Sequence, residues 1–197
     1  MRNSPTDFRA CTVKFNGLAN RIITDIKIFP AFDPEQPPSP PIPAYESKAL
    51  WDTGATKSLI TGSTARAMSL YSVGTTIMKH AGGSSPVNNY LVNFFLPNNV
   101  GISGVLVSEC QDDTGSFGAI IGMDIITKGD FSITNVGGET CMTFRFPSIN
   151  TIDYVAEARR LKYAGVGRNA PCPCGKKDAS GKAVKFKNAS LFTIAVL

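Results

Sequence analysis

The sequence predicts an all-β domain, either a barrel or a sandwich, with short helices and a small basic tail. Short runs of β-branched and aromatic residues alternate with turns rich in Gly, Pro and Asn, which is typical of all-β folds. Of the 197 residues, 43% are hydrophobic and 18% are charged, so the chain can form a core and is not wholly disordered. We expect no membrane partner, because no apolar run approaches the roughly 18 residues that a span needs.

The strands are expected where apolar and polar residues alternate, or where short apolar runs lie between turns. Within residues 21–29, for example, every second residue from Ile22 to Ile28 lies on one face. The expected strands are residues 10–15, 21–29, 47–51, 58–61, 73–79, 87–96, 102–110, 118–121, 131–134 and 140–146. Helices are expected at residues 63–70 and 123–127, with a connecting helix at residues 149–164, where residues recur at helical spacing.

A proline-rich stretch separates the second expected strand from the third. Seven of the 13 prolines lie within residues 30–43. Proline has no backbone N–H to donate to a sheet and favours extended conformations, so we expect a surface excursion between two strands. A plain linker is the favoured interpretation, and a docking site for proline-binding partners is the alternative.

The net charge of +5 is unevenly distributed along the chain. Residues 157–187 carry nine basic and two acidic side chains, so the remaining residues sum to a charge of −2. Only this tail is therefore able to attract polyanions such as RNA by charge alone. A solvated basic tail without a partner is the alternative.

The cysteines indicate a reducing compartment. There are five, an odd number, and only Cys172 and Cys174 lie close together in the sequence. This scatter argues against a disulfide framework. The first residues also lack the basic and then apolar pattern of an export signal, so we expect a soluble cytoplasmic protein.

The most informative stretch is an apolar strand that runs directly into Asp52, Thr53 and Gly54. Burying an unpaired carboxylate costs roughly several kcal/mol, so Asp52 needs a partner group or a proton. Gly54 lets the backbone approach whatever lies opposite, and the Thr53 hydroxyl is able to hydrogen-bond across a seam. Further along, a second apolar strand at residues 119–121 ends in Gly122. This second strand is able to pack against the loop that bears Asp52.

Together these elements resemble the retropepsin-like aspartic proteases, in which Asp-Thr-Gly-Ala and a downstream Ile-Ile-Gly build half of the active site. The resemblance covers residues 45–147 and implies a closed acid-protease barrel in which Asp52 is catalytic. It implies that the loop is supported by Thr53, Gly54, Ala55, Ile120, Ile121 and Gly122.

The same resemblance has a consequence for assembly. The reaction needs two aspartates that share a proton, and the family motif supplies one in each chain. The active protein would therefore be a symmetric homodimer that hydrolyses peptide bonds in peptide or protein substrates with an activated water. No metal, nucleotide or other cofactor is required for this catalysis.

Between the two motifs, residues 78–87 form two strand-like runs joined by a glycine pair. By position this hairpin resembles the flap of the family, a mobile element that closes over bound peptide. The tip of the hairpin consists of Ala81, Gly82, Gly83 and Ser84. A plain surface hairpin is the alternative. The only histidine, His80, lies beside the tip, and we expect no direct catalytic role for it.

A second Asp-Thr-Gly tripeptide begins at Asp113. It follows the polar residues 109–112 and not an apolar strand, and no second Ile-Ile-Gly comes after it. We therefore expect a turn over residues 112–116 and no second catalytic motif.

Residues 167–175 resemble the start of the SEC-C motif, a zinc-binding element found at the end of the SecA translocase and in many bacterial proteins. In the complete motif two more ligands follow, but this chain has Ala189 and Ser190 at those positions. We therefore expect a degenerate motif, with a zinc ion at Cys172 and Cys174 as the alternative.

The resemblances divide the chain into a protease-like domain (residues 1–147), a helical linker (148–166), a degenerate SEC-C-like motif (167–190) and a tail (191–197). The combination suggests an aspartic endopeptidase of the bacterial cytoplasm. Its basic tail would contact a protein, the ribosome or RNA, and no DNA partner is expected. Two alternatives stay open: an inactive peptide-binding and dimerisation module with the tail as adaptor, and an RNA-binding protein led by its tail.

Overall fold

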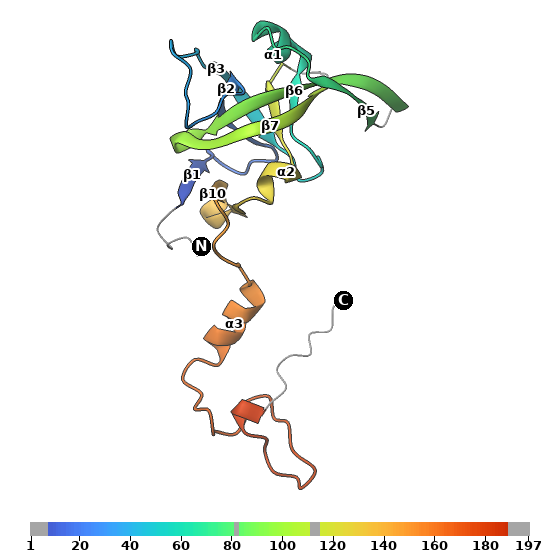
Figure 1. Ribbon diagram of the computed structural model, residues 1–197. Coiled ribbons are helices and arrows are strands. Elements are labelled where there is room, and N and C mark those ends of the chain that lie inside the picture. The colour runs from blue at the N-terminus through green and yellow to red at the C-terminus, as the bar shows by residue number, and fades with distance from the viewer. Residues whose placement is uncertain (1–7, 81–82, 111–114, 189–197) are drawn as a thin grey trace. The chain divides into compact units, whose positions relative to one another are not determined.

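Figure 1 shows a computed structural model of the chain, which describes residues 8–80, 83–110 and 115–188. The chain divides into two compact units, Met1–Asn150 and Thr151–Leu197. Strands dominate the first unit, whereas the second contains one α-helix, one 3₁₀ helix and two isolated strand bridges in its described part. No helix in the described part of the chain is long and apolar enough to cross a membrane.

Six of the described strands close into a barrel. The order β2-β3-β8-β4-β7-β6 returns to its start because β6 also pairs with β2. The strands are β2 (Ile22–Pro30), β3 (Tyr45–Trp51), β8 (Ala119–Ile121), β4 (Leu59–Thr61), β7 (Val100–Cys110) and β6 (Gly83–Leu96). The all-β closed barrel with short helices that the sequence predicts is confirmed. Residues 31–44, between β2 and β3, form neither helix nor strand.

The other strands extend the barrel or pack beside it. Strand β5 (Gly74–His80) pairs with β6 outside the closed barrel. A separate sheet has the order β1-β10-β9, formed by β1 (Arg9–Lys14), β10 (Cys141–Phe146) and β9 (Asp130–Thr134). The two sheets meet at Trp51, whose ring stacks on Phe131 with centroids 5.3 Å apart.

Alternate side chains fill the barrel interior, as the period of a strand requires. In β2, the side chains of Ile22, Ile26 and Ile28 are buried, in agreement with the alternation in the sequence. Phe94 of β6 and Ile121 of β8 are fully buried in the same core. Strand β8 thus runs through the core and ends at Ile121, and Gly122 follows it directly before the start of α2.

Helix α1 (Gly62–Ala67) is shorter than the helix predicted over residues 63–70. Its start is capped by Thr61, whose hydroxyl oxygen accepts the backbone N–H of Thr64 at 3.2 Å. The helix ends early because Ser69 has a left-handed backbone with a φ of 51°. Helix α2 (Met123–Ile126) lies close to its predicted position.

The sequence predicts a helix that begins at residue 149, but helix α3 (Tyr154–Lys162) begins later, so the predicted start is wrong. The carboxylate of Asp153 accepts the N–H of Ala156 at 2.9 Å and so caps the helix at this point. The N–H groups of Ile149 and Asn150, at the predicted start, donate to the carboxylate of Asp130, and residues 149–153 are not helical.

In the second unit, the segment after α3 folds back on itself as an irregular hairpin. Isolated bridges pair Pro171 with Lys185 and Lys177 with Ala183. The described part of the chain also contains single-turn 3₁₀ helices at Pro97–Asn99, Val136–Gly138 and Phe186–Asn188.

Candidate active site

Asp52 lies at the point where β3 leaves the barrel. Trp51, the residue before it, is buried, and its indole N–H donates to the hydroxyl of Thr24 at 3.0 Å. The stack of Trp51 on Phe131 fixes the same side chain from the neighbouring sheet. Trp51, which is buried, hydrogen-bonded and stacked, therefore fixes the position of Asp52 at the end of β3.

The carboxylate of Asp52 is oriented by its own turn. Its Oδ1 accepts the backbone N–H of Gly54 at 2.8 Å, and the Asp52 carbonyl accepts the N–H of Ala55 at 3.2 Å. A Cβ at position 54 would lie 3.1 Å from that Oδ1, so glycine leaves the oxygen room. Thr53 and Gly54 are exposed and Ala55 is half-buried. The prediction of a buried carboxylate needs correction, because Asp52 is half-buried in the single chain.

The Ile-Ile-Gly strand lies directly beside this loop. Strand β8 pairs in parallel with β3, with Ile120 opposite Leu50 and Ile121 opposite Trp51. The N–H of Asp52 continues this pairing by donating to the carbonyl of Ile121 at 3.0 Å. The structure thus brings the two sequence motifs together in one seam, defined here as the contact between residues 52–58 and residues 121–124.

Gly122 is packed so closely in the seam that a side chain would not fit. A Cβ at this position would lie 2.5 Å from the carbonyl carbon of Lys57 and 2.9 Å from the carbonyl oxygen of Ala55. The next residue, Met123, donates its N–H to that Ala55 oxygen at 2.8 Å. Close approach of two backbones therefore explains why glycine is needed here.

Two residues of the seam were not assigned from the sequence. Ser58 is fully buried; its Oγ accepts the N–H of Gly122 at 3.0 Å and donates to Oδ1 of Asp124 at 2.8 Å. No local signal singles out this hydroxyl, since Ser58 looks like the first residue of an ordinary strand. Its function follows only from the approach of a segment far away in the sequence.

The β5–β6 hairpin extends beyond the barrel (Figure 1). Pairing of β6 with β7 begins at Asn89, and the described residues before it pair with β5. At this root Glu109 accepts the Tyr90 hydroxyl at 2.7 Å and the Asn88 amide at 3.1 Å. Burial and the Glu109 carboxylate raise the pKa of Tyr90, which keeps its hydroxyl proton for this bond. The root of the hairpin is thus fastened to the barrel by side chains.

The predicted flap tip is only partly visible. Ala81 and Gly82 lie outside the described residues. Gly83 pairs with His80 and has a φ of 127°, a left-handed conformation that favours glycine, and Ser84 is exposed. These features fit the end of a hairpin.

The second Asp-Thr-Gly tripeptide falls mostly outside the described residues, since Asp113 and Thr114 are not among them. Gly115 has a φ of 61°, which is typical of a turn. The predicted turn over residues 112–116 stays a prediction.

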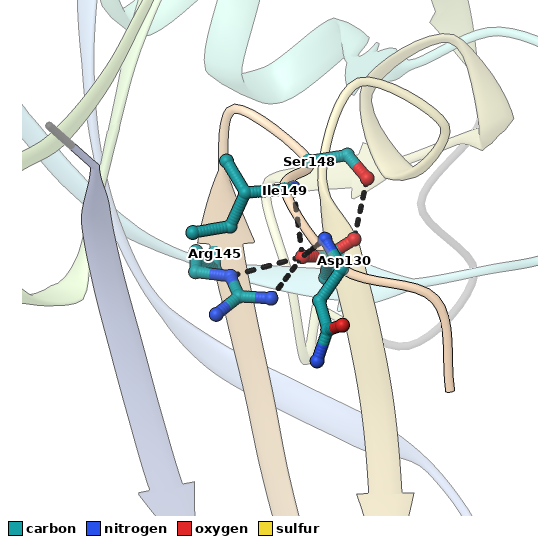
Figure 2. Close-up of polar contacts among 5 residues, drawn as sticks. Asp130, Arg145, Ser148 and Ile149 are labelled. Atoms are coloured by element: carbon teal, nitrogen blue, oxygen red, sulfur yellow. Dashed lines mark hydrogen bonds and ion pairs between the residues drawn. The ribbon is translucent and has the colours of Figure 1, made fainter. Parts of the chain in front are cut away.

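Figure 2 shows a second carboxylate with a specific environment, Asp130 at the start of β9. It accepts hydrogen bonds from the Arg145 guanidinium and the Ser148 hydroxyl, and from the N–H groups of Ile149 at 3.1 Å and Asn150 at 3.2 Å. Burial alone would raise the pKa of Asp130, but the Ser148 hydroxyl and the Arg145 guanidinium lower it to about 2. This ionised carboxylate fixes the chain where it leaves β10.

The cysteine pair lies in a tight turn of the second unit. Cys172 is buried and its N–H donates to the carbonyl of Val184 at 2.8 Å, while Cys174 is exposed. The N–H of Cys174 donates to the sulfur of Cys172 at 3.4 Å. A hydrogen bond from the Cys172 thiol lowers the pKa of Cys174, and the same contact raises the pKa of Cys172.

This donor set does not fit a structural zinc ion within one chain. A tetrahedral site needs four ligands, and the two thiols supply half of them. No group of three or more His, Cys, Asp or Glu side chains gathers anywhere in the residues that the structure describes. The positions of the missing ligands, residues 189 and 190, lie outside the described residues.

No protein-family model matches the chain, and no curated protein matches it. Among solved structures, the chain is similar to the crystal structure of a retropepsin-like aspartic protease from Rickettsia conorii. That likeness has a TM-score of 0.43 and 8% sequence identity, and it covers 71% of this chain and 96% of the other.

Proposed function

We propose that the protein is an aspartic endopeptidase whose active site is completed by a second copy of the same chain. The observation that carries the proposal is the seam, in which Asp52 leaves a buried strand and its Oδ1 is oriented by the N–H of Gly54. Ile121 and Gly122 hold the same loop through backbone contacts. A carboxylate fixed in this way at the surface of one chain is suited to meet an identical carboxylate across a twofold axis.

The chemistry follows from two carboxylates that share one proton. Like charges a few ångströms apart do not both ionise, so one Asp52 carries the proton and polarises the substrate carbonyl. The ionised Asp52 takes a proton from water, whose attack gives a tetrahedral diol. The diol collapses when the leaving nitrogen is protonated. The substrate is an extended peptide or a flexible protein segment, held by main-chain hydrogen bonds as an added strand.

Digestion of a peptide library tests this proposal. Purified protein and its Asp52→Asn variant are incubated with proteome-derived peptides at several pH values, and new termini are read by mass spectrometry. Cuts made only by the unaltered protein support the proposal and give its side-chain preference. Identical digests from two folded, dimeric proteins would contradict it and favour an inactive peptide-binding module.

Mixing experiments separate a shared active site from one contained in a single chain. Unaltered protein is unfolded and refolded with an increasing excess of Asp52→Asn, so that mixed dimers dominate. A shared dyad predicts that activity per unaltered chain falls toward zero, because almost every unaltered chain then has an inactive partner. Activity that stays constant per unaltered chain would contradict the dimeric dyad while leaving proteolysis intact.

A second function, binding of RNA, is proposed for the basic unit Thr151–Leu197. Most of its basic side chains are exposed, namely Arg160, Lys162, Arg168, Lys176, Lys177, Lys182 and Lys185. One of its few acidic groups, Asp178, is engaged by its own turn and accepts from Ser180 and from the N–H of Lys182. The hydrogen bond from Ser180 helps to lower the pKa of Asp178.

Fluorescence anisotropy with a labelled single-stranded RNA tests this second function in the full chain. Affinity should fall steeply with salt, because bound phosphates release their counterions. Lys176→Glu with Lys177→Glu should weaken binding and lower the salt slope by about 0.7 for each phosphate that the protein no longer neutralises. Affinity that is insensitive to salt and to both substitutions would contradict it.

A further inference from the structure

The seam that holds the Asp52 loop has three hydrogen-bonded contacts along its length, two between backbone groups and one that uses a side chain. At the start of the loop, the N–H of Asp52 donates to the carbonyl of Ile121, and in the middle the carbonyl of Ala55 accepts the N–H of Met123. Both are backbone bonds, which almost any sequence could make. At the end of the loop the contact depends on a side chain, the hydroxyl of Ser58.

The hydrogen bonds of Ser58 have a defined direction. Its Oγ accepts the N–H of Gly122 at 3.0 Å, so the hydroxyl proton must point elsewhere, and it points to Oδ1 of Asp124 at 2.8 Å. By accepting the hydroxyl proton, Asp124 fixes the rotation of the Ser58 hydroxyl, so that a lone pair of its oxygen faces the N–H of Gly122. Because Ser58 is fully buried, bulk water does not replace either partner, and an unmade bond here would be costly.

We propose that Ser58 and Asp124 are positioning residues that set the placement of Asp52 for catalysis. This inference rests on the proposed aspartic endopeptidase. Loss of the hydroxyl or of its acceptor releases the end of the loop whose other end carries Asp52. Two carboxylates that share a proton and a water tolerate little displacement, since misplacement by about 1 Å costs about 100-fold in rate.

The experiment compares Ser58→Ala, Asp124→Ala and Asp124→Asn in the full chain with a cleavable peptide from the library. We expect kcat to fall about 100-fold in both alanine variants, with KM little changed, because the substrate-binding surface is kept. Asp124→Asn should retain most of kcat, because its amide oxygen also accepts from Ser58. Rescue by asparagine assigns the effect to the hydrogen bond and not to the charge of Asp124.

The chain offers a matched control in Thr140. This side chain is also buried, and its hydroxyl accepts the N–H of Ala19 at 2.9 Å and donates to Oδ1 of Asn135 at 2.7 Å. Thr140→Val removes an equivalent hydrogen-bond relay outside the seam. It should lower the melting temperature like Ser58→Ala but leave kcat unchanged at a temperature where every variant is folded.

The outcomes separate this inference from the function on which it rests. If the unaltered protein cleaves and the seam variants lose stability without losing kcat, as Thr140→Val should, the positioning function is overturned and the endopeptidase stands. If the unaltered protein cleaves nothing, the proposed function falls and this inference falls with it. Should Ser58→Ala fail to fold, the pair Asp124→Ala and Asp124→Asn decides, because both leave Ser58 in place.

Discussion

Asp52 and Asp130 lie one residue away from the two stacked rings of Trp51 and Phe131, yet their carboxylates have different environments. Asp130 is 13% exposed and accepts from a guanidinium, a hydroxyl and two backbone N–H groups, among them that of Ile149. Asp52 is half-buried, and the structure records one N–H, that of Gly54, on its Oδ1. A carboxylate surrounded by donors holds the fold, whereas one oriented by a single local donor keeps acceptor capacity for a partner or a substrate.

The largest expected effect is the loss of activity in Asp52→Asn. The amide oxygen still accepts the N–H of Gly54, so the loop keeps its shape, but the side chain no longer takes a proton from water. We expect kcat/KM to fall by at least about 10³-fold, with the free energy of unfolding changed by no more than about 0.5 kcal/mol. Peptide cleavage and urea unfolding of the same preparations measure both. A large loss of stability would show that Asp52 is structural, as Asp130 is.

Gly122→Ala tests the close approach of the two backbones. The new Cβ would meet the carbonyl carbon of Lys57 at 2.5 Å, and this backbone contact has no flexible end to move aside. We expect a loss of about 3 kcal/mol in unfolding free energy together with reduced cleavage. Gly167→Ala is the matched control, because a Cβ there meets nothing within 4 Å and no left-handed φ is required. Equal melting temperatures for the two variants would contradict the close packing of the seam.

Asp130→Asn should lower stability and leave catalysis unchanged, which is the opposite of the effect expected for Asp52→Asn. It removes the ion pair with Arg145 and the strongest acceptor for Ser148, while the Asp52 loop keeps its own contacts. We expect about 2 kcal/mol less stability and a melting temperature lower by about 6 °C, with kcat unchanged below the transition. Thermal melts by circular dichroism measure the first effect and peptide cleavage the second. A drop in kcat without a drop in stability would reverse the assignment of the two carboxylates.

The pH dependence of stability sharpens the same comparison. The pKa of Asp130 is lowered from 3.8 to about 2 in the folded protein, so its ionised form stabilises the fold fully above pH 4. This contribution, about 2 kcal/mol, is lost as the pH falls from about 4 to about 2. Urea unfolding at several pH values should show this loss in the unaltered protein, and the difference from Asp130→Asn should shrink over that window. A difference that stays constant with pH would contradict the lowered pKa.

Most strands were predictable from the sequence because their limits are local. Pro30 and Gly74, for example, lie at the ends of strands that the apolar alternation already indicates. The predicted start of α3 was wrong because helical spacing alone does not mark the cap: in the structure the carboxylate of Asp153 accepts the N–H of Ala156, and the helix begins there.

The candidate site was predictable to the extent that its motifs are contiguous. Asp52 and Gly122 are marked by the short motifs that contain them, and the structure brings those motifs together. Ser58 and Asp124 were not predictable from the sequence, because the hydrogen bond between their side chains joins residues 66 positions apart. Catalysis, the dimer and any ion at Cys172 stay predictions.

The position of Trp51 has a practical consequence. It is the only tryptophan of the chain, it immediately precedes Asp52, and its indole is bonded to Thr24 and stacked on Phe131. Its intrinsic fluorescence is therefore a built-in optical reporter of the candidate site. Emission excited in the indole band should respond when a peptide binds or when two chains meet at Asp52, so titrations need no attached dye.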